Sequence, residues 1–171
     1  MNNSFAFELR DVRPGDEDFL YRLYAAERAE EMALTGWGVE QQQVFLSMQY
    51  RMRQQGYRLQ FPQAETTIAT VQGVPMGALV LNRETEAIRI VDIGTLPIFV
   101  VDGVEHNSAG LGRQLLAHVM AEAERTGRPL IAHVLKSNRA WKLWQRLGWM
   151  ATEDDGIHLS IEWWPPGRRE A

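Results

Sequence analysis

The chain has 171 residues, which is about the size of one domain. Hydrophobic residues make up 45% of it, enough for a core that needs no metal or disulfide, and cysteine is absent. This excludes disulfide scaffolds, cysteine-ligated zinc or iron–sulfur sites and a cysteine nucleophile. The 18 basic and 22 acidic residues give a net charge of −4, which argues against a nucleic-acid partner.

Neither a membrane helix nor a secretory signal is expected. The longest apolar run, residues 96–101, is far shorter than the about 20 residues that a membrane helix needs. Residues 1–5 have neither the basic nor the apolar region of a secretory signal. We expect a cytoplasmic protein, with residues 1–171 forming one domain and no membrane partner.

The first part of the chain predicts a strand followed by two helices. Alternating hydrophobicity at residues 5–9 predicts the strand, and Asp16 is placed to cap the first helix, which runs toward Glu31. Glycines on both sides of Trp37 break the pattern, and a second helix is predicted from about Val39 to Gln55. Its apolar face consists of Val44, Phe45, Met48 and Met52.

Strand signals dominate the middle of the chain. Three β-rich runs, at residues 66–71, 76–81 and 88–95, are separated by short turns and predict an antiparallel meander. A helical stripe then runs from Leu111 to Gly127. The continuous apolar run at residues 130–135 is typical of a strand buried on both faces.

The last part predicts a short helix at residues 138–147 and a strand at 157–161, with a further strand near 150–152 as an alternative. The order is β-α-α-β-β-β-α-β-α-β. The strand–helix–strand sequence in the second half implies a parallel crossover within a mixed sheet, so we expect an α/β (α+β) fold.

One loop stands out, between a strand and an amphipathic helix. Its small residues let a ligand approach the backbone, and the helix start offers unpaired N–H groups at the positive end of the dipole, which suits phosphate. An ordinary glycine-rich turn is the alternative, because the dinucleotide and P-loop fingerprints are incomplete. The loop consists of Asn107, Ser108, Ala109, Gly110, Leu111, Gly112 and Arg113.

Two motifs in this order resemble the GNAT superfamily of acyl-CoA-dependent N-acyltransferases. The family's Gln/Arg-x-x-Gly-x-Gly/Ala loop matches residues 107–112, with Asn107 in the first place. Its Asn-x-Ala-x-x-Leu-Tyr-x-x-x-Gly-Phe motif matches residues 138–149, with tryptophan at both aromatic positions. Residues 88–93 and the exit at Leu96-Pro97 resemble the family's fourth strand. The resemblance covers nearly the whole chain and implies a GNAT-like, mostly antiparallel mixed sheet with helices on both faces.

The resemblance also implies an activity. The protein would move an acetyl group from acetyl-CoA to a primary amine of a small molecule or peptide by direct attack. The histidines show no metal-ligand spacing, so no metal is expected. Backbone N–H groups near residues 96–98 would polarise the thioester carbonyl. The residues expected around acetyl-CoA are Leu96, Pro97, Ile98, Asn107, Ser108, Ala109, Gly110, Leu111, Gly112, Arg113, Asn138, Ala140 and Trp141.

The sequence departs from the family in two ways. About seven extra residues, around 101–106, separate the strand exit from the loop, and the arginine of the family's basic loop is missing. Trp144 replaces the tyrosine that often protonates the leaving thiolate, and an indole N–H donates a hydrogen bond but does not ionise usefully. Trp144 is either a catalytic candidate or a core residue.

Asp92 is the predicted general base. It lies in a strand between apolar neighbours, where partial burial would raise its pKa, although a solvated or ion-paired carboxylate is the alternative. His133 lies on the apolar run at residues 130–135, and we expect it to be a hydrogen-bonded core histidine.

The resemblance places the acceptor near the first two helices and the last hairpin. Glu30 and Glu31 are candidates for binding a cationic amine, together with the acids at Glu27 and residues 153–155, or they form solvated faces. Trp37 would line the acceptor pocket or staple two helices together. The tryptophans at 163–164 form either a homodimer contact or a strand end that packs on its own sheet.

Three functions are compatible with this sequence. The first is the N-acetyltransferase. The second is a GNAT-like fold that binds acyl-CoA or a protein partner without efficient catalysis, which the two departures favour. The third, a nucleotide-binding module unrelated to CoA, requires an all-parallel sheet that the predicted meander opposes.

Overall fold

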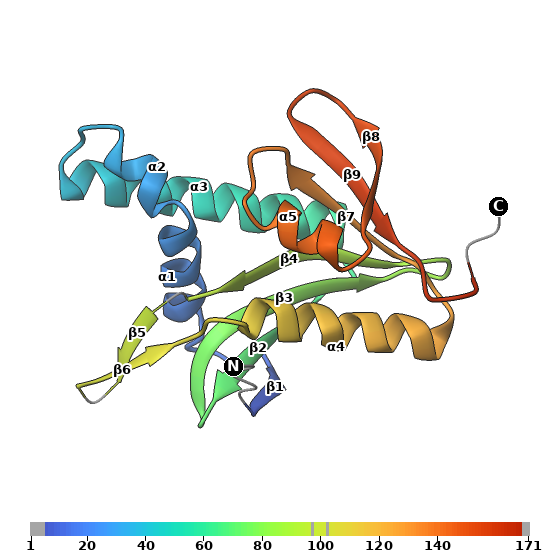
Figure 1. Cartoon of the computed structure of the whole chain (residues 1–171). Helices are drawn as coiled ribbons and strands as arrows, with labels where there is room; N and C mark the ends of the chain where they lie inside the picture. The colour runs from blue at the N-terminus through green and yellow to red at the C-terminus, as the bar shows by residue number, and fades with distance from the viewer. Residues whose placement is uncertain (1–5, 97, 102, 169–171) are drawn as a thin grey trace.

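The computed structural model describes residues 6–96, 98–101 and 103–168 of the chain (Figure 1). Its elements are, in order, β1 (Phe7–Asp11), α1 (Glu17–Glu27), α2 (Ala29–Ala33), α3 (Val39–Gln60), β2 (Glu65–Val71), β3 (Val74–Arg83), β4 (Ile88–Thr95), β5 (Ile98–Val101), β6 (Val104–Asn107), α4 (Leu111–Thr126), β7 (Leu130–Leu135), α5 (Trp141–Arg146), β8 (Met150–Asp154) and β9 (His158–Trp163).

Seven strands form one sheet in the order β1-β2-β3-β4-β7-β9-β8. Only the β4–β7 pair is parallel, so the sheet is mixed and mostly antiparallel, as predicted. Strands β5 and β6 pair only with each other and form a hairpin outside this sheet (Figure 1). The extra residues between the strand exit and the loop are therefore this hairpin.

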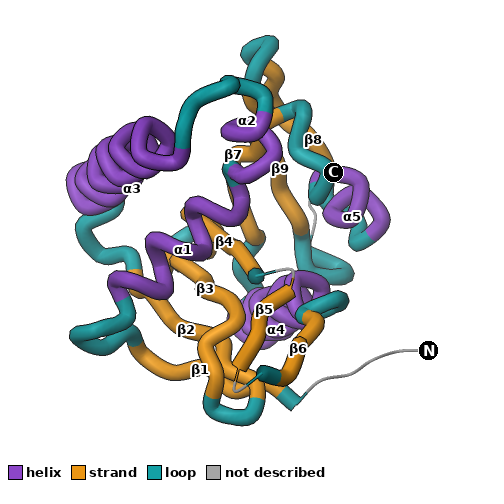
Figure 2. The backbone as a smooth tube through the Cα atoms, turned by 90° about the vertical axis from the view of Figure 1, so that its left-hand side faces the viewer, coloured by secondary structure: helices purple, strands orange, loops and turns teal. Residues whose placement is uncertain are grey.

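Helices cover both faces of the sheet, as predicted. Figure 2 shows α1 and α3 on one side and α4 and α5 on the other. The largest core cluster joins β3, β4, β7 and β9 to α4, whose buried stripe includes Leu116, Val119 and Ala123. Burial of this apolar stripe holds α4, and with it the loop before α4, in a fixed place on the sheet.

Several boundaries differ from those predicted. The first helix does not continue to Glu31, because the chain breaks at Arg28 and resumes as the short α2. The alternative strand near residues 150–152 is present as β8. Strand β7 is buried on one face only, so the prediction for His133 is wrong: this histidine is exposed and lines a cavity of about 410 Å³ with Glu153, His158 and Ser160. None of the described helices is long and apolar enough to cross a membrane.

A β-bulge in β4 decides which side chains reach the face under α1. Val80 pairs with Asp92, but Leu81 pairs with Ile90, so β4 carries one extra residue at Val91. Ile88 and Ile90 belong to the core on the α4 face, and regular alternation would send Asp92 there too. The extra residue reverses the alternation, as bulges do, and Asp92 faces Arg53 of α3 instead.

Strands β4 and β7 separate after a short common stretch. Their pairing covers only residues 88–90 of β4 and 130–132 of β7. Beyond it β4 continues to Thr95 and β7 to Leu135 with no pairing between them in the described chain. The backbone groups that face this gap have no strand partner, so the gap is a place where a ligand could meet the backbone.

Candidate functional site

The loop before α4 has the geometry expected for binding an anion. Gly110 is the N-cap of α4 and has a left-handed φ of 95°, which favours glycine, and no side chain caps this helix end. The first N–H groups of a helix lack intrahelical acceptors and lie at the positive end of its dipole. A Cβ on Gly112 would meet open space, and Arg113 is exposed one residue further on.

The structure brings this loop against the exit of β4. The Ser108 hydroxyl, although buried, donates a hydrogen bond to the Leu96 carbonyl oxygen. The Leu111 N–H closes the turn by donating to the Ser108 carbonyl oxygen at 2.9 Å. Four residues predicted to surround the cofactor, Leu96, Ser108, Gly110 and Leu111, therefore lie together.

The predicted carbonyl-polarising group needs correction. The Leu96 N–H already donates to the Met76 carbonyl oxygen at 2.8 Å, and residue 97 is a proline, which has no N–H. Leu96 therefore cannot serve as the donor. Pro97 lies outside the described residues, and the side chains of Ile98 and Asn107 are not described. If a thioester is bound here, the donors for its carbonyl would have to come from the part of β4 that faces the gap, or from the Ile98 backbone.

On the opposite face of β4, three charged side chains meet. The Arg53 guanidinium of α3 lies 3.0 Å from Asp92 of β4 and 3.7 Å from Glu27, the last residue of α1. It also lies over the rings of Tyr24 and Tyr57, at 4.6 and 5.6 Å from their centroids. When both half-buried carboxylates are ionised, the single cation between them leaves one net negative charge.

The two carboxyl groups have raised pKa values. Burial raises the pKa of Glu27 to about 7, with help from the nearby Asp92 and against the opposing effect of Arg53. Burial also raises the pKa of Asp92, while Arg53 and the Ile93 N–H oppose the rise. Burial keeps Tyr57 protonated by raising its pKa to about 12. A carboxyl group with a pKa near 7 is a good proton acceptor at neutral pH.

Gly94 lets Glu27 approach the strand. A Cβ on Gly94 would overlap the Glu27 carboxylate and touch Leu23. Glycine is therefore required at this position if the carboxylate is to lie against β4.

The carboxylate and the helix start lie on opposite faces of the same stretch of β4. A Cβ on Gly77 of β3 would lie 2.9 Å from the Gly94 carbonyl oxygen and 3.5 Å from the Leu111 side chain. Gly94 is in turn the residue that Glu27 approaches. A donor held at the start of α4 and an acceptor beside Glu27 would thus meet at the end of β4.

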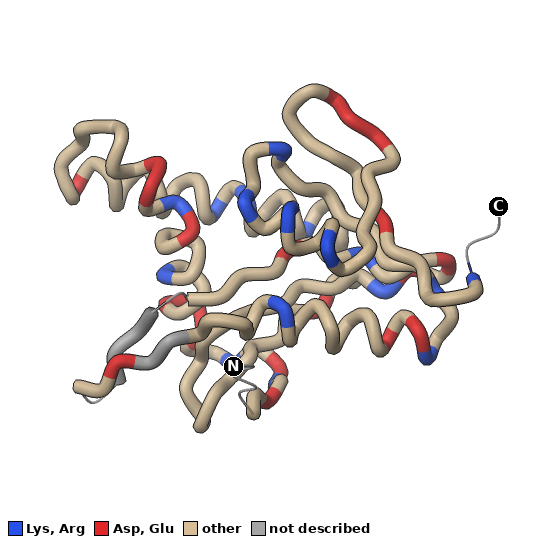
Figure 3. Tube along the Cα trace, in the orientation of Figure 1, with Lys and Arg blue, Asp and Glu red and all other residues tan. Residues whose placement is uncertain are grey.

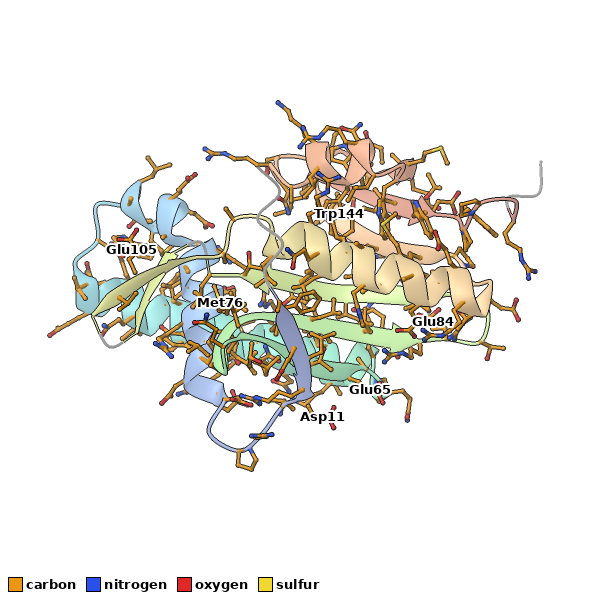
Figure 4. The ribbon with its side chains drawn as sticks, turned by 60° about the horizontal axis from the view of Figure 1, so that its bottom comes forward. Asp11, Glu65, Met76, Glu84, Glu105 and Trp144 are labelled. Atoms are coloured by element: carbon orange, nitrogen blue, oxygen red, sulfur yellow. The ribbon has the colours of Figure 1, made fainter. Side chains whose placement is uncertain are left out.

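The second motif has a structural explanation. The Asn138 side-chain oxygen accepts the Ala140 N–H at 2.9 Å, which shapes the turn into α5, and Trp141 packs on the core. Trp144 (labelled in Figure 4) is buried, and its ring centroid lies 4.7 Å from that of Trp149. These surroundings are those expected if Trp144 is a core residue. A catalytic role for Trp144 stays a prediction.

The predicted acceptor-binding residues do not converge on this site. Glu31 pairs with Arg28. Glu30 pairs with Arg139 at 3.2 Å, and the side chains of Glu30 and Arg139 are both highly exposed. Trp37 packs edge-on against Phe45 at 5.2 Å, as the staple alternative requires. Their roles in binding an acceptor stay predictions.

The acids of the last hairpin are also engaged locally. Figure 3 shows acidic residues in the β8–β9 turn and only basic charges on α5. Asp154 pairs with Lys136 at 2.7 Å, and Asp155 accepts the His158 N–H. Trp163 is buried at the end of β9, which favours packing on its own sheet over a dimer contact.

The sequence places Glu27 among the acids that either bind a cationic amine or form a solvated face, and does not indicate it as the base. A signal is present in the sequence: Glu27 continues the spacing of Leu23 and Phe19, which lie one and two turns earlier and are buried. A carboxylate on the apolar stripe of a helix predicts a buried carboxylate. Arg53 was missed because the apolar residues of α3 suggested a different buried face.

Comparison with known proteins identifies the fold. No protein-family model matches the sequence, and no curated protein does. Among solved structures, the PaiA N-acetyltransferase of Thermoplasma acidophilum in complex with coenzyme A matches with a TM-score of 0.66 at 14% identity, over 93% of this chain and 99% of that one. A putative GNAT-family acetyltransferase of Desulfovibrio desulfuricans matches with 0.59 at 18% identity, over 93% and 99%.

The ribosomal-protein-S18-alanine N-acetyltransferase of Escherichia coli matches with a TM-score of 0.56 at 20% identity, over 92% of this chain and 91% of that one. The chain therefore has the fold of the GNAT N-acetyltransferases, over nearly the full length of each. The expected resemblance is confirmed at the level of the fold.

Proposed function

We propose that this protein is an N-acetyltransferase that moves an acetyl group from acetyl-CoA to a primary amine of a small molecule or peptide. The observation that carries the proposal is the Glu27 carboxylate, with its pKa of about 7, held against Gly94 on the strand whose other face meets the start of α4. We also propose that the whole chain acts as one domain in the cytoplasm.

The residues fit acetyl-CoA. The uncapped start of α4, Gly110 and Gly112, would hold the pyrophosphate through backbone N–H groups, with Arg113 adding charge. When bound there, acetyl-CoA supplies a thioester carbonyl for a neutral amine to attack. The solved complex of the Thermoplasma relative with coenzyme A supports this choice of donor.

Glu27 would take the proton from the acceptor amine, since only the neutral amine is a nucleophile. Arg53 would position both carboxylates through its contacts with Glu27 and Asp92. In this proposal Asp92 acts through Arg53 and Glu27 is the base, in place of the predicted Asp92. Acids around one cation favour an acceptor that arrives as a cationic amine.

The alternative is a GNAT-like protein that binds acyl-CoA or a partner without efficient catalysis. Trp144 favours it, because this buried indole offers no ionisable hydroxyl in the place of the family tyrosine. A thiol with a pKa of ~8.5 is a tolerable leaving group without a general acid. The absence of the tyrosine would therefore slow acetyl transfer but would not prevent it.

Calorimetric titration with acetyl-CoA, followed by a thiol-release assay over a panel of amines, tests both functions. Gly112→Asp places a carboxylate at the start of α4, where it repels a pyrophosphate but favours the helix dipole by about 0.3–1 kcal/mol. We expect it to weaken acetyl-CoA binding at least about tenfold without loss of stability. This glycine suits the test better than Gly110, whose left-handed φ would strain any variant.

Gly112→Ala is the matched control, because its Cβ meets open space. It should bind acetyl-CoA like the wild type. Binding that is lost in Gly112→Asp, together with thiol release dependent on an amine, supports the acetyltransferase. Binding without release with any amine supports the alternative in its acyl-CoA-binding form. No binding by the wild type contradicts the acetyltransferase and leaves only the partner-binding form of the alternative.

A further inference from the structure

A row of large apolar side chains covers the outer face of α3. We call Trp37, Val44, Met48, Met52 and Leu59 the α3 stripe; their exposed fractions are 42%, 70%, 50%, 60% and 76%. The sequence predicted that Val44, Met48 and Met52 share a face, and they do, but this face points to solvent. Patches of this kind on a folded protein mark interaction sites.

Apart from the edge contact of Trp37 with Phe45, the stripe is not part of any core cluster of the described chain. The inner face of α3 is formed by Leu46, Tyr50, Arg53 and Tyr57, at helical spacing. The stripe lies nearly opposite, since its members are offset from these residues by about half a helical turn. Figure 2 shows α3 at one edge of the molecule, with no described element on its outer side. The stripe also lines a groove of about 600 Å³ through Trp37, Val44 and Met48.

The positions in the stripe are self-complementary. Suppose that two copies of α3 cross antiparallel with a two-fold axis at Met48. Each residue before Met48 in one copy then faces the residue equally far after Met48 in the other copy. Val44 then meets Met52 of the second copy and Met48 meets Met48, while Leu59 faces the segment just before α3, which carries Trp37. Every member of the stripe finds another member, which is the property of an isologous interface.

The charges beside the stripe agree with this arrangement. Glu40 lies near the start of α3 and Arg58 near its end, on the same side of the stripe, and neither has an ion-pair partner among the described residues. Antiparallel crossing brings the acidic end of one helix to the basic end of the other. A parallel partner of the same sequence would place like charges together.

From the exposure, the self-complementary spacing and the charges, we propose that the α3 stripe is the contact of a homodimer, formed by antiparallel α3 helices around Met48. The occupant of this face is a second copy of the chain. The helix has 22 residues, so the contact is about 33 Å long. We expect a contact made by one helix face and its preceding loop to bury less than the ~800 Å² per partner of a standard interface, and we therefore expect a weak dimer, with a Kd of about 1–100 μM.

Analytical ultracentrifugation of the full chain, from about 1 to about 500 μM, measures this equilibrium. Met48→Glu puts two carboxylates across the two-fold axis and should raise the Kd at least about 100-fold. Met48 is half exposed in the monomer, so the fold should survive, which circular dichroism verifies. Ile157→Glu, which replaces a 64% exposed isoleucine in the β8–β9 turn, is the matched control and should dimerise normally.

A charge swap tests the direction of crossing. Glu40→Arg and Arg58→Glu should each weaken the dimer, and the double variant should restore it. A chain that stays monomeric over the whole range, including one that binds lipid vesicles instead, overturns the proposal. A dimer that Met48→Glu leaves unchanged overturns it as well.

Discussion

At the scale of single residues, the main question is which carboxylate takes the proton. Asp92 is hydrogen-bonded to Arg53, whereas Glu27 lies farther from it and has a pKa of about 7. Glu27→Gln should lower kcat by about 10²–10⁴-fold, the usual contribution of a general base. The rise of kcat/KM with pH through about 7 should disappear in the variant. Measuring kcat/KM across this range for Glu27→Gln and Asp92→Asn decides between the two.

Stability provides the control for this variant. The folded pKa of Glu27 is above its ordinary value of 4.5, so the folded state holds the proton more tightly than the unfolded state. Stability from this group is present below pH 4.5 and is lost as pH rises through about 7. Glu27→Gln should therefore be at least as stable as the wild type at alkaline pH. If the rise of kcat/KM with pH disappears in Asp92→Asn and not in Glu27→Gln, the base is Asp92.

Gly94 gives a second test of the same carboxylate. Gly94→Ala keeps an ordinary strand conformation but pushes Glu27 away from β4. We expect kcat/KM to fall about tenfold, with its apparent pKa moving down as the carboxyl group moves toward water. The folded state should lose less than about 1 kcal/mol, because the displaced atoms end a flexible side chain.

Gly56→Ala is a matched glycine control in α3, with open space around its Cβ. It should raise stability by up to about 1 kcal/mol and leave kcat/KM unchanged. Equal kinetics for Gly94→Ala and the wild type would show that the position of Glu27 does not matter.

At the scale of elements, Asp16 joins β1 to α1. The sequence predicted a helix cap, but no side-chain cap bond forms there. Asp16 instead accepts two hydrogen bonds from Arg10 of β1, each 2.8 Å, and one from the Arg13 N–H. The bonds from Arg10 and Arg13 lower the pKa of Asp16 to about 2 despite its burial. The residue therefore fixes how the edge strand meets the first helix.

Asp16→Ala should lower the free energy of unfolding by about 1–3 kcal/mol at neutral pH, because it leaves the Arg10 guanidinium unpaired. The folded pKa lies below the ordinary value of 3.8, so this contribution is present above about 4 and is lost as pH falls toward 2. Urea unfolding at several pH values measures it. Asp18→Ala, in the first turn of the same helix, is the control and should change the free energy of unfolding little. If the loss of unfolding free energy in Asp16→Ala persists at pH 2, the ionised Asp16 carboxylate is not its source.

The sequence alone was sufficient to predict the elements whose hydrophobic pattern is local. The meander β2–β4, the stripe of α4 and strand β7 have nearly the predicted bounds, because alternation and helical spacing follow directly from burial. The loop before α4 was found for the same reason, since its glycines and its place before a helix are visible in the sequence. These elements are the framework of the candidate site.

The acid–base cluster could not be predicted, because it depends on tertiary structure. The bulge at Val91 turns Asp92 toward α3, and no local pattern marks a single extra residue in a strand. Helix α3 has two faces with apolar residues, and periodicity does not say which one meets the sheet. The exposed one, the α3 stripe, has no covering element in the described chain, and the inner one carries Arg53.

At the scale of the whole molecule, the β5–β6 hairpin contains the residues that the sequence resemblance predicts to be an insertion. It projects from the sheet between the exit of β4 and the start of α4 (Figure 1). The hydrogen bond from Ser108 to Leu96 closes its base without using the hairpin itself. The strand exit and the helix start are therefore held together independently of the extra residues, and we expect the hairpin to be separable from the fold and from the cofactor site.

Replacing residues 99–106 with an Asn-Gly turn tests this expectation, because Ile98 and Asn107 already pair and a two-residue turn can join them. Shortening a loop changes its closure entropy little, so the free energy of unfolding should change by less than about 1 kcal/mol. Acetyl-CoA should bind within about threefold of the wild-type Kd if the start of α4 carries the site. A stable variant whose affinity falls more than about tenfold would place the hairpin in the cofactor site and make it a remodelled part of the loop.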